Sequence, residues 1–308
     1  MLCLSILQAG AIATNITPAL KNNTFMHIKF LDQLELNFDT MYGVNFAELS
    51  DLAYNPKTKI LHMVSDKGAL FSFHTKISKK IEELTPLRAT KLKNTRGKRF
   101  KKWKRDSEGL TLDGKGRLLI SFEGKAKIGY FHKNSSLYGQ MIRKYKLPSL
   151  LKNTKNYRFK NKSLESVAWH SVHGVLTASE WPLKRDNNKR QTIYALDGKT
   201  WHFTAEPDTG SAVVAMEVMD DGNILILERA YSGLLQPFVI TLKKVYLNNL
   251  KAGLCSTKIL AKMNSHEGWQ LDNFEGLTKV GKNRYMMISD DGDNFFQRTL
   301  LIYFEVID

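Results

Sequence analysis

Three pairs of acidic residues repeat one spacing along this chain. The two members of each pair are 15 positions apart, and the pairs are Glu108 with Glu123, Glu165 with Glu180, and Glu275 with Asp290. Carboxylate oxygens are the ligands that Ca²⁺ and Mg²⁺ prefer, and a carboxylate can also act as a general base. The equal spacing therefore points to metal-ion or acid-base chemistry at a site that several repeats share.

The acids belong to a longer repeated pattern. Each copy begins with an acid or small residue and Gly-Leu or a similar dipeptide, continues through a turn rich in Asp, Gly and Asn, and ends in an apolar segment with a closing acid. The first copy has one extra residue, and the fourth lacks the leading acid but keeps the closing Glu228. Such self-similarity predicts a repeat architecture. In chain order the copies begin at Ser50, Glu108, Glu165, Val213 and Glu275.

Each copy predicts two short strands joined by a tight turn. Asp113-Gly114 and Asp221-Gly222 are strong hairpin signals because apolar residues flank them. Further apolar segments such as 300–304 follow the hairpins, and helical periodicity is scarce. Four-stranded sheets arranged radially bury such units without leaving long exposed edges. The sequence therefore predicts an all-β protein, a β-propeller with five visible repeats.

The predicted ring has five or six blades. Residues 243–267 or the N-terminal residues 25–38 would supply the strands of a sixth blade. We also expect residues 26–30 to close the ring beside the last strands. In this interpretation residues 21–308 form one propeller domain, and residues 1–20 are a signal-peptide remnant or a disordered N-terminus.

A propeller would bring these carboxylates to one rim. The leading acid stands at the start of a strand and the closing acid at the end of the next, antiparallel strand, so both lie at the same end of the hairpin. Like charges this close raise each other's pKa unless cations compensate them. We expect Asp66 on the same rim. The predicted metal ligands are Glu108, Glu123, Glu165, Glu180, Glu228, Glu275, Asp290 and Asp291, and the candidate catalytic residues are Glu108, Glu165 and Glu275.

Two kinds of cation could neutralise this rim. The oxygen-rich ligand set suits Ca²⁺ or another hard divalent cation, and the sequence has no clustered Cys and His to favour zinc. Lys67, Lys125 and Arg229 follow the closing acids by one or two residues and are the predicted anion-binding residues. They could pair with the acids or receive a phosphate. The alternative is that the acids cap strand ends and hold bridging water.

Sequence motifs of other enzyme classes are absent. The chain has no Gly-x-Ser-x-Gly, Walker loop, Gly-x-Gly-x-x-Gly, Cys-x-x-Cys or His-Glu-x-x-His. None of the serines near the closing acids has a paired His in the local sequence, so hydrogen bonding at the rim is favoured over a nucleophilic role. These serines are Ser65, Ser121, Ser179 and Ser289.

The ordered series of motifs resembles the family known as the esterase-like activity of phytase, from about residue 44 to residue 304. The resemblance implies a propeller-type domain with recurrent Glu and Asp, often in exported bacterial proteins, for which phosphoesterase or phytase-like activity has been proposed. The family's acids fall on the predicted metal ligands. Asp51 and Ser166 replace the usual Gly. The motifs are Ser50-Asp51-Leu52-Ala53-Tyr54-Asn55-Pro56, Asp106-Ser107-Glu108-Gly109-Leu110, Leu164-Glu165-Ser166-Val167-Ala168, Leu225-Ile226-Leu227-Glu228-Arg229, and Asn273-Phe274-Glu275-Gly276-Leu277 with Ser289-Asp290-Asp291.

The formal net charge of +16 is concentrated in two segments. Residues 76–105 contain 13 Lys and Arg against Glu82 and Glu83, and residues 141–162 contain eight and no acid. We interpret them as two basic insertions that capture an anionic partner, or else as solvated lysine-rich loops. Basic loops without interleaved aromatic motifs do not predict specific nucleic-acid binding.

The first residues indicate export. Residues 2–7 are apolar, and Ala11-Ile12-Ala13 fits a small-x-small cleavage pattern, although the basic n-region is missing. The alternative is an N-terminal strand or a frayed end. No stretch is long and uniform enough to span a bilayer. The predicted location is therefore periplasmic or secreted, and otherwise cytoplasmic.

Together these features predict an exported phosphoesterase or phytase-like hydrolase. It would act on a small anionic phosphate ester at the acidic, metal-assisted rim. The alternative is a non-catalytic propeller that binds an anionic ligand or a protein partner.

Overall fold

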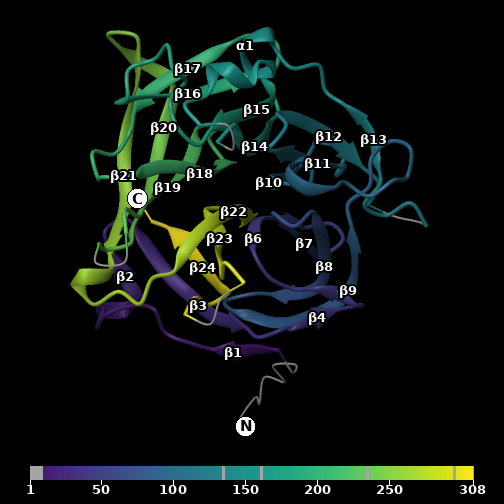
Figure 1. Cartoon of the computed structure of the whole chain (residues 1–308). Coiled ribbons are helices and arrows are strands. Elements are labelled where there is room, and N and C mark those ends of the chain that lie inside the picture. Colours follow the sequence, from purple (N-terminus) through teal and green to yellow (C-terminus); the bar gives the residue numbers. More distant parts are fainter. Residues whose placement is uncertain (1–9, 134–135, 160–161, 234–235, 294–295, 308) are drawn as a thin grey trace.

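The computed structural model describes residues 10–133, 136–159, 162–233, 236–293 and 296–307, and nearly all of its regular structure is β-strand. Five sheets stand around a central axis as the blades of a propeller (Figure 1). Their innermost strands contact one another in cyclic order, with the last returning to the first. These inner strands are β6 (Leu49–Asn55), β10 (Ser107–Leu112), β14 (Leu164–His170), β18 (Ser211–Val218) and β22 (Asn273–Gly281).

Blades 1 to 4 are four-stranded antiparallel meanders, and blade 5 combines three consecutive C-terminal strands with strands from the N-terminal part of the chain. Blade 1 continues with β7 (Ile60–Ser65), β8 (Ala69–Ile77) and β9 (Ile81–Lys91), and blade 2 with β11 (Leu118–Phe122), β12 (Lys127–Phe131) and β13 (Met141–Lys144). Blade 3 continues with β15 (Gly174–Ser179), β16 (Arg190–Ala195) and β17 (Thr200–Thr204), and blade 4 with β19 (Ile224–Ala230), β20 (Val239–Lys251) and β21 (Leu254–Asn264). Blade 5 contains β23 (Arg284–Asp290), β24 (Leu300–Val306), β3 (Ile28–Leu36), β1 (Ala11–Ala13) and β2 (Thr24–Phe25).

Several short elements lie outside the five sheets. They are β4 (Thr40–Met41), β5 (Val44–Asn45), the helix α1 (Ser149–Lys152), and the 3₁₀ turns η1 (Lys21–Asn23), η2 (Lys102–Lys104), η3 (Thr154–Asn156) and η4 (Ser265–Glu267). The described residues include no helix long and apolar enough to cross a membrane.

The N-terminal part of the chain closes the ring. Strand β3 pairs antiparallel with β24, and Leu34 lies opposite Leu301, so residues from the two ends complete one sheet. Figure 1 shows the purple β3 beside the yellow β24. The prediction that residues 26–30 close the ring is therefore confirmed. Of the two blade counts left open by the sequence, five is correct, because β20 and β21 are outer strands of blade 4 and β3 belongs to blade 5.

Apolar strands form the core because both faces of each blade meet a neighbour. All five residues of β11 are buried, and their side chains alternate between the two faces. Phe122 packs among side chains shared by blades 1 and 2, and Leu119 packs on the blade 3 side. Burial of one such side chain contributes about 1.5–3 kcal/mol. This burial holds the hairpin ends, and the acids on them, in place.

Gly109 and Gly276 allow the inner strands to approach closely. A Cβ added to Gly109 would lie 2.6 Å from the Val167 backbone nitrogen, and one added to Gly276 would lie 2.7 Å from the Cα of Asp51. Backbone atoms cannot move aside as a flexible side chain can. The Gly of the Glu-Gly-Leu motif is therefore required for packing beside the axis.

Asp51, which replaces that Gly in the first repeat, joins three blades. Its carboxyl oxygens accept hydrogen bonds from the amide nitrogens of Leu52 at 2.8 Å, Leu110 at 2.7 Å and Leu277 at 2.9 Å. These donors belong to β6, β10 and β22. Burial raises the pKa of Asp51 well above its usual range, with the hydrogen bonds opposing that effect. The departure from the family motif is thus an inter-blade contact.

The two basic segments have regular structure. Residues 76–105 include β9, the outer strand of blade 1, and residues 141–162 include β13 and α1. Part of the positive charge therefore lies on the propeller itself. At the N-terminus, Ala11–Ala13 form β1 and pair with β3. Residues 1–9, most of the expected signal segment, lie outside the described residues.

Candidate functional site

A β-bulge interrupts the inner hairpin of every blade near the leading position of the repeat. The register shifts between Ser107 and Leu110 in blade 2 and between Leu164 and Ser166 in blade 3. Corresponding shifts occur in the other three blades. A bulge re-aims the side chain it carries and breaks the alternation of faces. Because the bulges include Glu108 and Glu165, the local backbone determines where these carboxylates point.

Five carboxylates from blades 2 and 3 form two overlapping groups. In each group one oxygen from every residue lies within 4.8 Å of the others. Such spacing suits a hard cation, since two ligands on opposite sides of Ca²⁺ are about 5 Å apart. The groups are Asp106, Glu108 and Glu123, and Glu123, Glu165 and Glu180, so Glu123 belongs to both.

Four of these carboxylates are buried, Asp106 is half-buried, and the oxygens are incompletely paired. The Oε1 atom of Glu123 and the Oε2 atom of Glu165 have no hydrogen-bond partner among the described residues. Burial, reinforced by neighbouring carboxylates, raises the pKa of Glu108 and of Glu165 well above the usual range. Burial also raises the pKa of Glu123 to about 8, with Lys162 opposing the shift. Unsatisfied buried oxygens with raised pKa values indicate a place for a proton or a cation.

Lys162 distinguishes the two groups. Its Nζ lies 2.8 Å from Glu180 Oε2. Burial acts to lower the pKa of Lys162, but Glu165, Glu180 and other nearby carboxylates raise it above its usual value, so the ammonium stays charged. The group with Glu180 therefore already contains a cation. Within the described chain, the other group forms no ion pair with Lys or Arg. The set Asp106, Glu108 and Glu123 is thus the better candidate for a metal ion.

Gly124 supports this set. A Cβ at Gly124 would lie 2.0 Å from the Trp103 backbone oxygen and 3.0 Å from Asp106 Oδ2. The Gly124 amide also donates a hydrogen bond to Asp106 and thereby favours its ionised form, although burial raises the pKa of Asp106 overall. Only glycine leaves room for Asp106 beside the turn between β11 and β12.

Arg229, a predicted anion-binding residue, joins blades 3, 4 and 5. Its Nη2 lies 3.3 Å from Glu180 Oε1, and its Nη1 lies 3.3 Å from Glu275 Oε1. Burial raises the pKa of Glu275, and the Arg229 charge opposes that rise. The candidate catalytic residue Glu275 therefore lies with Glu180 at one end of the central axis, which we call the mouth, and Arg229 partly neutralises its charge.

Glu228 makes a separate ion pair. Lys243 Nζ lies 2.7 Å from Glu228 Oε2 and 2.7 Å from Glu206 Oε1, and all three side chains are buried. Burial raises the pKa of Glu228, while Lys243 opposes the rise. Blade 4 lacks the leading acid and has Val214 at its bulge. Glu228 is therefore in neither carboxylate group.

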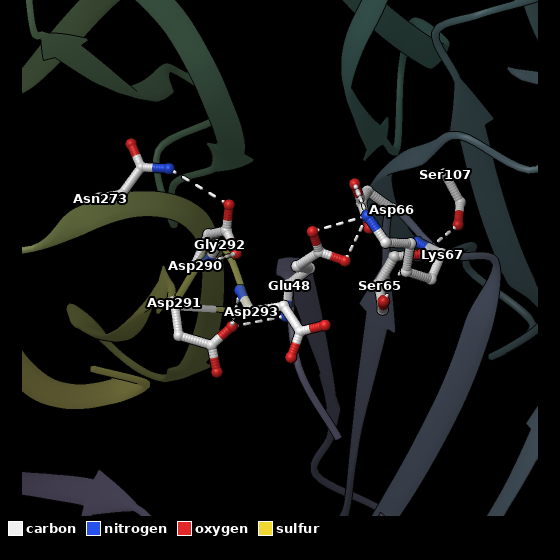
Figure 2. A network of polar contacts seen from close by, with 10 residues as sticks. All are labelled: Glu48, Ser65, Asp66, Lys67, Ser107, Asn273, Asp290, Asp291, Gly292 and Asp293. Carbon is white, nitrogen blue, oxygen red and sulfur yellow. Dashed lines mark hydrogen bonds and ion pairs between the residues drawn. The ribbon is translucent and has the colours of Figure 1, made fainter. Parts of the chain in front are cut away.

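Lys67 and the acids of blades 1 and 5 form the contacts in Figure 2. Lys67 Nζ lies 2.5 Å from Glu48 Oε2 and 3.5 Å from Asp66 Oδ2. Asp291 accepts hydrogen bonds from the Glu48 amide at 2.8 Å and from the Thr299 hydroxyl at 2.8 Å. Asp291 thus connects loops of two blades, and Lys67 neutralises the charges of Glu48 and Asp66.

Two further acids of the mouth, Asp66 and Asp290, have raised pKa values. Burial and Glu48 raise the pKa of Asp66 to about 7, against the effect of Lys67. Burial and Glu275 raise the pKa of Asp290 to about 8, while the Gly292 amide donates a hydrogen bond that opposes the rise. Both acids therefore hold protons close to neutral pH.

Lys125 and the rim serines have other surroundings. Lys125 lines a basic cavity behind the β11–β12 turn. Ser121 accepts a hydrogen bond from the Gly109 amide, and Ser179 and Ser289 donate to the backbone oxygens of Trp181 and Arg298. Hydrogen bonding by these serines, favoured over a nucleophilic role, is confirmed.

Sequence reasoning did not assign Asp106, Lys162 or Glu48 to the site. Asp106 stands two residues before Glu108 in a quoted motif, so its position was an available signal. Lys162 lies in a segment interpreted as a basic insertion, and Glu48 precedes the first repeat. Only folding shows that these residues reach the mouth.

A model of the family described as esterase-like activity of phytase matches residues 44–295. The chain belongs to the phytase-like family. This match confirms the resemblance stated from the motifs. No curated protein matches this phytase-like protein.

Propellers of other functions resemble this phytase-like protein weakly. A PQQ-bound aldose sugar dehydrogenase from Streptomyces coelicolor has 10% identity and a TM-score of 0.46, covering 90% of this chain and 97% of its own. Virginiamycin B lyase from Staphylococcus aureus has 9% identity and a TM-score of 0.41, with coverage of 96% and 99%. A luciferin-regenerating enzyme has 9% identity and a TM-score of 0.42, with coverage of 84% and 92%. Similarities this distant carry no argument about function.

Proposed function

We propose that this phytase-like protein is a phosphoesterase assisted by a divalent cation. The observation that carries the proposal is the set Asp106, Glu108 and Glu123, whose oxygens converge without a Lys or Arg partner among the described residues. The oxygen-only donor set fits Ca²⁺, or another hard divalent cation, rather than zinc. The family description, which names an esterase-like activity, supports hydrolysis.

The chain's own residues have distinct roles in this proposal. A bound divalent cation would polarise a phosphoryl oxygen and lower the pKa of a bound water. Lys162 and Arg229, both charged at the mouth, would attract and orient a small anionic phosphate ester. Glu165 lies beside Glu123 but outside the first set. The charges of Lys162 and of a bound cation would oppose the burial that raises its pKa and favour its ionised form, so we assign it the general-base role. Glu275 would hold Arg229 in place.

Calcium titration of metal-free protein by calorimetry tests the proposal. Hydrolysis of p-nitrophenyl phosphate and bis-p-nitrophenyl phosphate is followed in the same samples. We expect calcium binding and metal-dependent turnover, both lost in Glu108→Gln and unchanged in the exposed control Glu267→Gln. Binding without turnover would favour the non-catalytic alternative, in which the mouth holds an anionic ligand. Absence of binding would reject the metal site.

We also propose export to the periplasm or medium, on the basis of the apolar start of the chain. Cleavage after Ala13 would remove β1, in which Ala11 is buried and pairs with Leu36. N-terminal sequencing of protein from separated cell fractions tests this. Recovery from the cytoplasm alone with Met1 intact would reject export.

A further inference from the structure

A cavity of about 1360 Å³ lies behind the β11–β12 turn, beside blades 2 and 3. It is larger than most small-molecule sites, which occupy about 300–1,000 Å³. Its wall combines Trp103, the turn itself, the segment after β13, and the region from α1 to Arg158. Both basic segments of the sequence therefore contribute to one concave site.

The wall of this cavity is strongly positive. Eight of its side chains are cationic, and none of the described residues that line it is acidic. No ion pair with a described carboxylate neutralises any of the eight. Like charges at such density repel one another and raise the local concentration of anions. Six of the eight are Lys125, Lys127, Lys144, Lys155, Arg158 and Lys184.

Two of these cations are held in place by the backbone. Lys127, only 5% exposed, donates from Nζ to the Lys104 backbone oxygen at 2.7 Å and lies 3.6 Å from the centre of the Phe122 ring. Arg158 donates to the backbone oxygens of Pro182 at 2.9 Å and Asp186 at 2.6 Å. Cations fixed before binding lose less conformational entropy when a ligand arrives.

Lys127 would gain a partner from an anion in the cavity. Burial and the neighbouring charge of Lys144 together lower the pKa of Lys127 to about 7, against the effect of Asp106. A nearby anion opposes both effects because it favours the charged ammonium. The position is thus suited to a ligand with a high negative charge.

We propose that this cavity binds a soluble small molecule that carries several phosphate groups. One phosphate could contact only a few of the cations, whereas a chain or ring of phosphates could reach opposite walls. The concave shape and limited volume of the site favour such a compact ligand over a nucleic-acid duplex or a membrane surface. The site is separate from the carboxylate groups and requires neither a metal ion nor hydrolysis.

Sodium tripolyphosphate is the probe for the first experiment. It is titrated into metal-free full-length protein at physiological salt, with binding followed by calorimetry and by tryptophan fluorescence, since Trp103 lines the cavity and is 53% exposed. We expect one site, with affinity at least roughly tenfold above that for orthophosphate because several charges act together. Equal affinities for the two anions would overturn the proposal.

Matched charge variants locate the binding. Replacing Lys144 and Lys155 by Gln should weaken tripolyphosphate binding by roughly tenfold or more, whereas replacing Lys251 and Lys258 of blade 4 by Gln should have little effect. Both pairs remove the same charge, and thermal unfolding checks that each variant folds. An equal loss in the two pairs would mean general attraction and would reject the cavity.

Further experiments separate this proposal from its alternatives and from the proposed phosphoesterase function. Glu108→Gln, which should abolish calcium-dependent hydrolysis, should retain tripolyphosphate binding, and loss of that binding would overturn the separate site. Vesicles with a multiply phosphorylated inositol headgroup are compared with the free headgroup. Binding of the vesicles alone, or tighter binding of an RNA oligonucleotide than of tripolyphosphate, would reject a soluble small ligand.

Discussion

Lys162 Nζ lies 2.8 Å from Glu180 Oε2, and this ion pair divides the acidic mouth into two unlike halves. On one side Lys162 and Arg229 compensate Glu180, while on the other Asp106, Glu108 and Glu123 have no such partner in the described part of the chain. Because a cation lowers the affinity of nearby carboxylates for a second cation, the pair determines which half is open to a metal ion.

Lys162→Met should make the second carboxylate group available to calcium. Removing the ammonium leaves Glu165 and Glu180 without the compensating charge of Lys162, so metal-free protein should lose about 1–2 kcal/mol of unfolding free energy, allowing for the partial exposure of Lys162. Calcium should restore more stability to this variant than to wild type. Thermal unfolding with and without calcium measures both effects.

The exposed Lys152→Met is the matched control for that variant and should respond to calcium as wild type does. If the calcium-dependent increase in Tm is the same in Lys162→Met as in wild type, Lys162 does not occupy a cation position.

Gly124→Ala should weaken calcium binding through the backbone. The new methyl group would meet the Trp103 backbone oxygen and Asp106 Oδ2, so the turn must shift and displace Asp106. We expect calcium affinity to fall by roughly tenfold or more, as found when groups that support metal ligands are lost. Gly281→Ala is the control, since nothing lies within 4 Å of its added Cβ. Unchanged affinity in Gly124→Ala would exclude Asp106 as a ligand.

Metal-free protein should become less stable as pH rises from about 5 to 8. Burial raises the pKa of Glu123 and of Asp290 to about 8, and that of Asp66 to about 7. The folded state therefore binds protons more tightly than the unfolded chain. This proton binding stabilises the folded state fully below about pH 4, the pKa of these acids in the unfolded chain, and the stabilisation is lost as the pH rises through their pKa in the folded state.

The pH series is measured as Tm at pH 5, 6.5 and 8. Lys127 acts in the opposite direction because its pKa is lowered to about 7, but the acids outnumber it. Calcium should reduce the slope, and Glu123→Gln should remove part of it. A Tm that rises steadily between pH 5 and 8 without metal would contradict the interpretation that these buried acids are protonated in the folded state.

Asp51→Ala should destabilise the ring without changing the mouth. The amides of Leu110 and Leu277 would lose their acceptor in the interior, which costs about 2–4 kcal/mol in total. Urea unfolding measures this loss, and Asp39→Ala, an exposed change, is the control. A loss below about 0.5 kcal/mol, within the range of surface changes, would show that water or rearrangement replaces the Asp51 contacts.

The repeated acids, Gly-Leu dipeptides and hairpin turns were enough to predict the propeller and its rim. Their information is local: the 15-residue spacing between Glu108 and Glu123 places both at the same end of one antiparallel hairpin, whatever surrounds it. The ring then follows because strands with two apolar faces need a neighbour on each side. The short segment at 26–30 likewise was expected to close the ring beside the last strands.

Tertiary structure alone decided the blade count and the partners of the acids. Residues 25–38 could equally have begun a blade of their own, and only the pairing of β3 with β24 places them in the fifth. Lys243 reaches Glu228, and Lys162 reaches Glu180, across chain separations that no motif encodes. Whether a carboxylate is neutralised depends on distance and burial in three dimensions. The sequence therefore determined where the acids gather, and the fold determined which of them remain open to a cation.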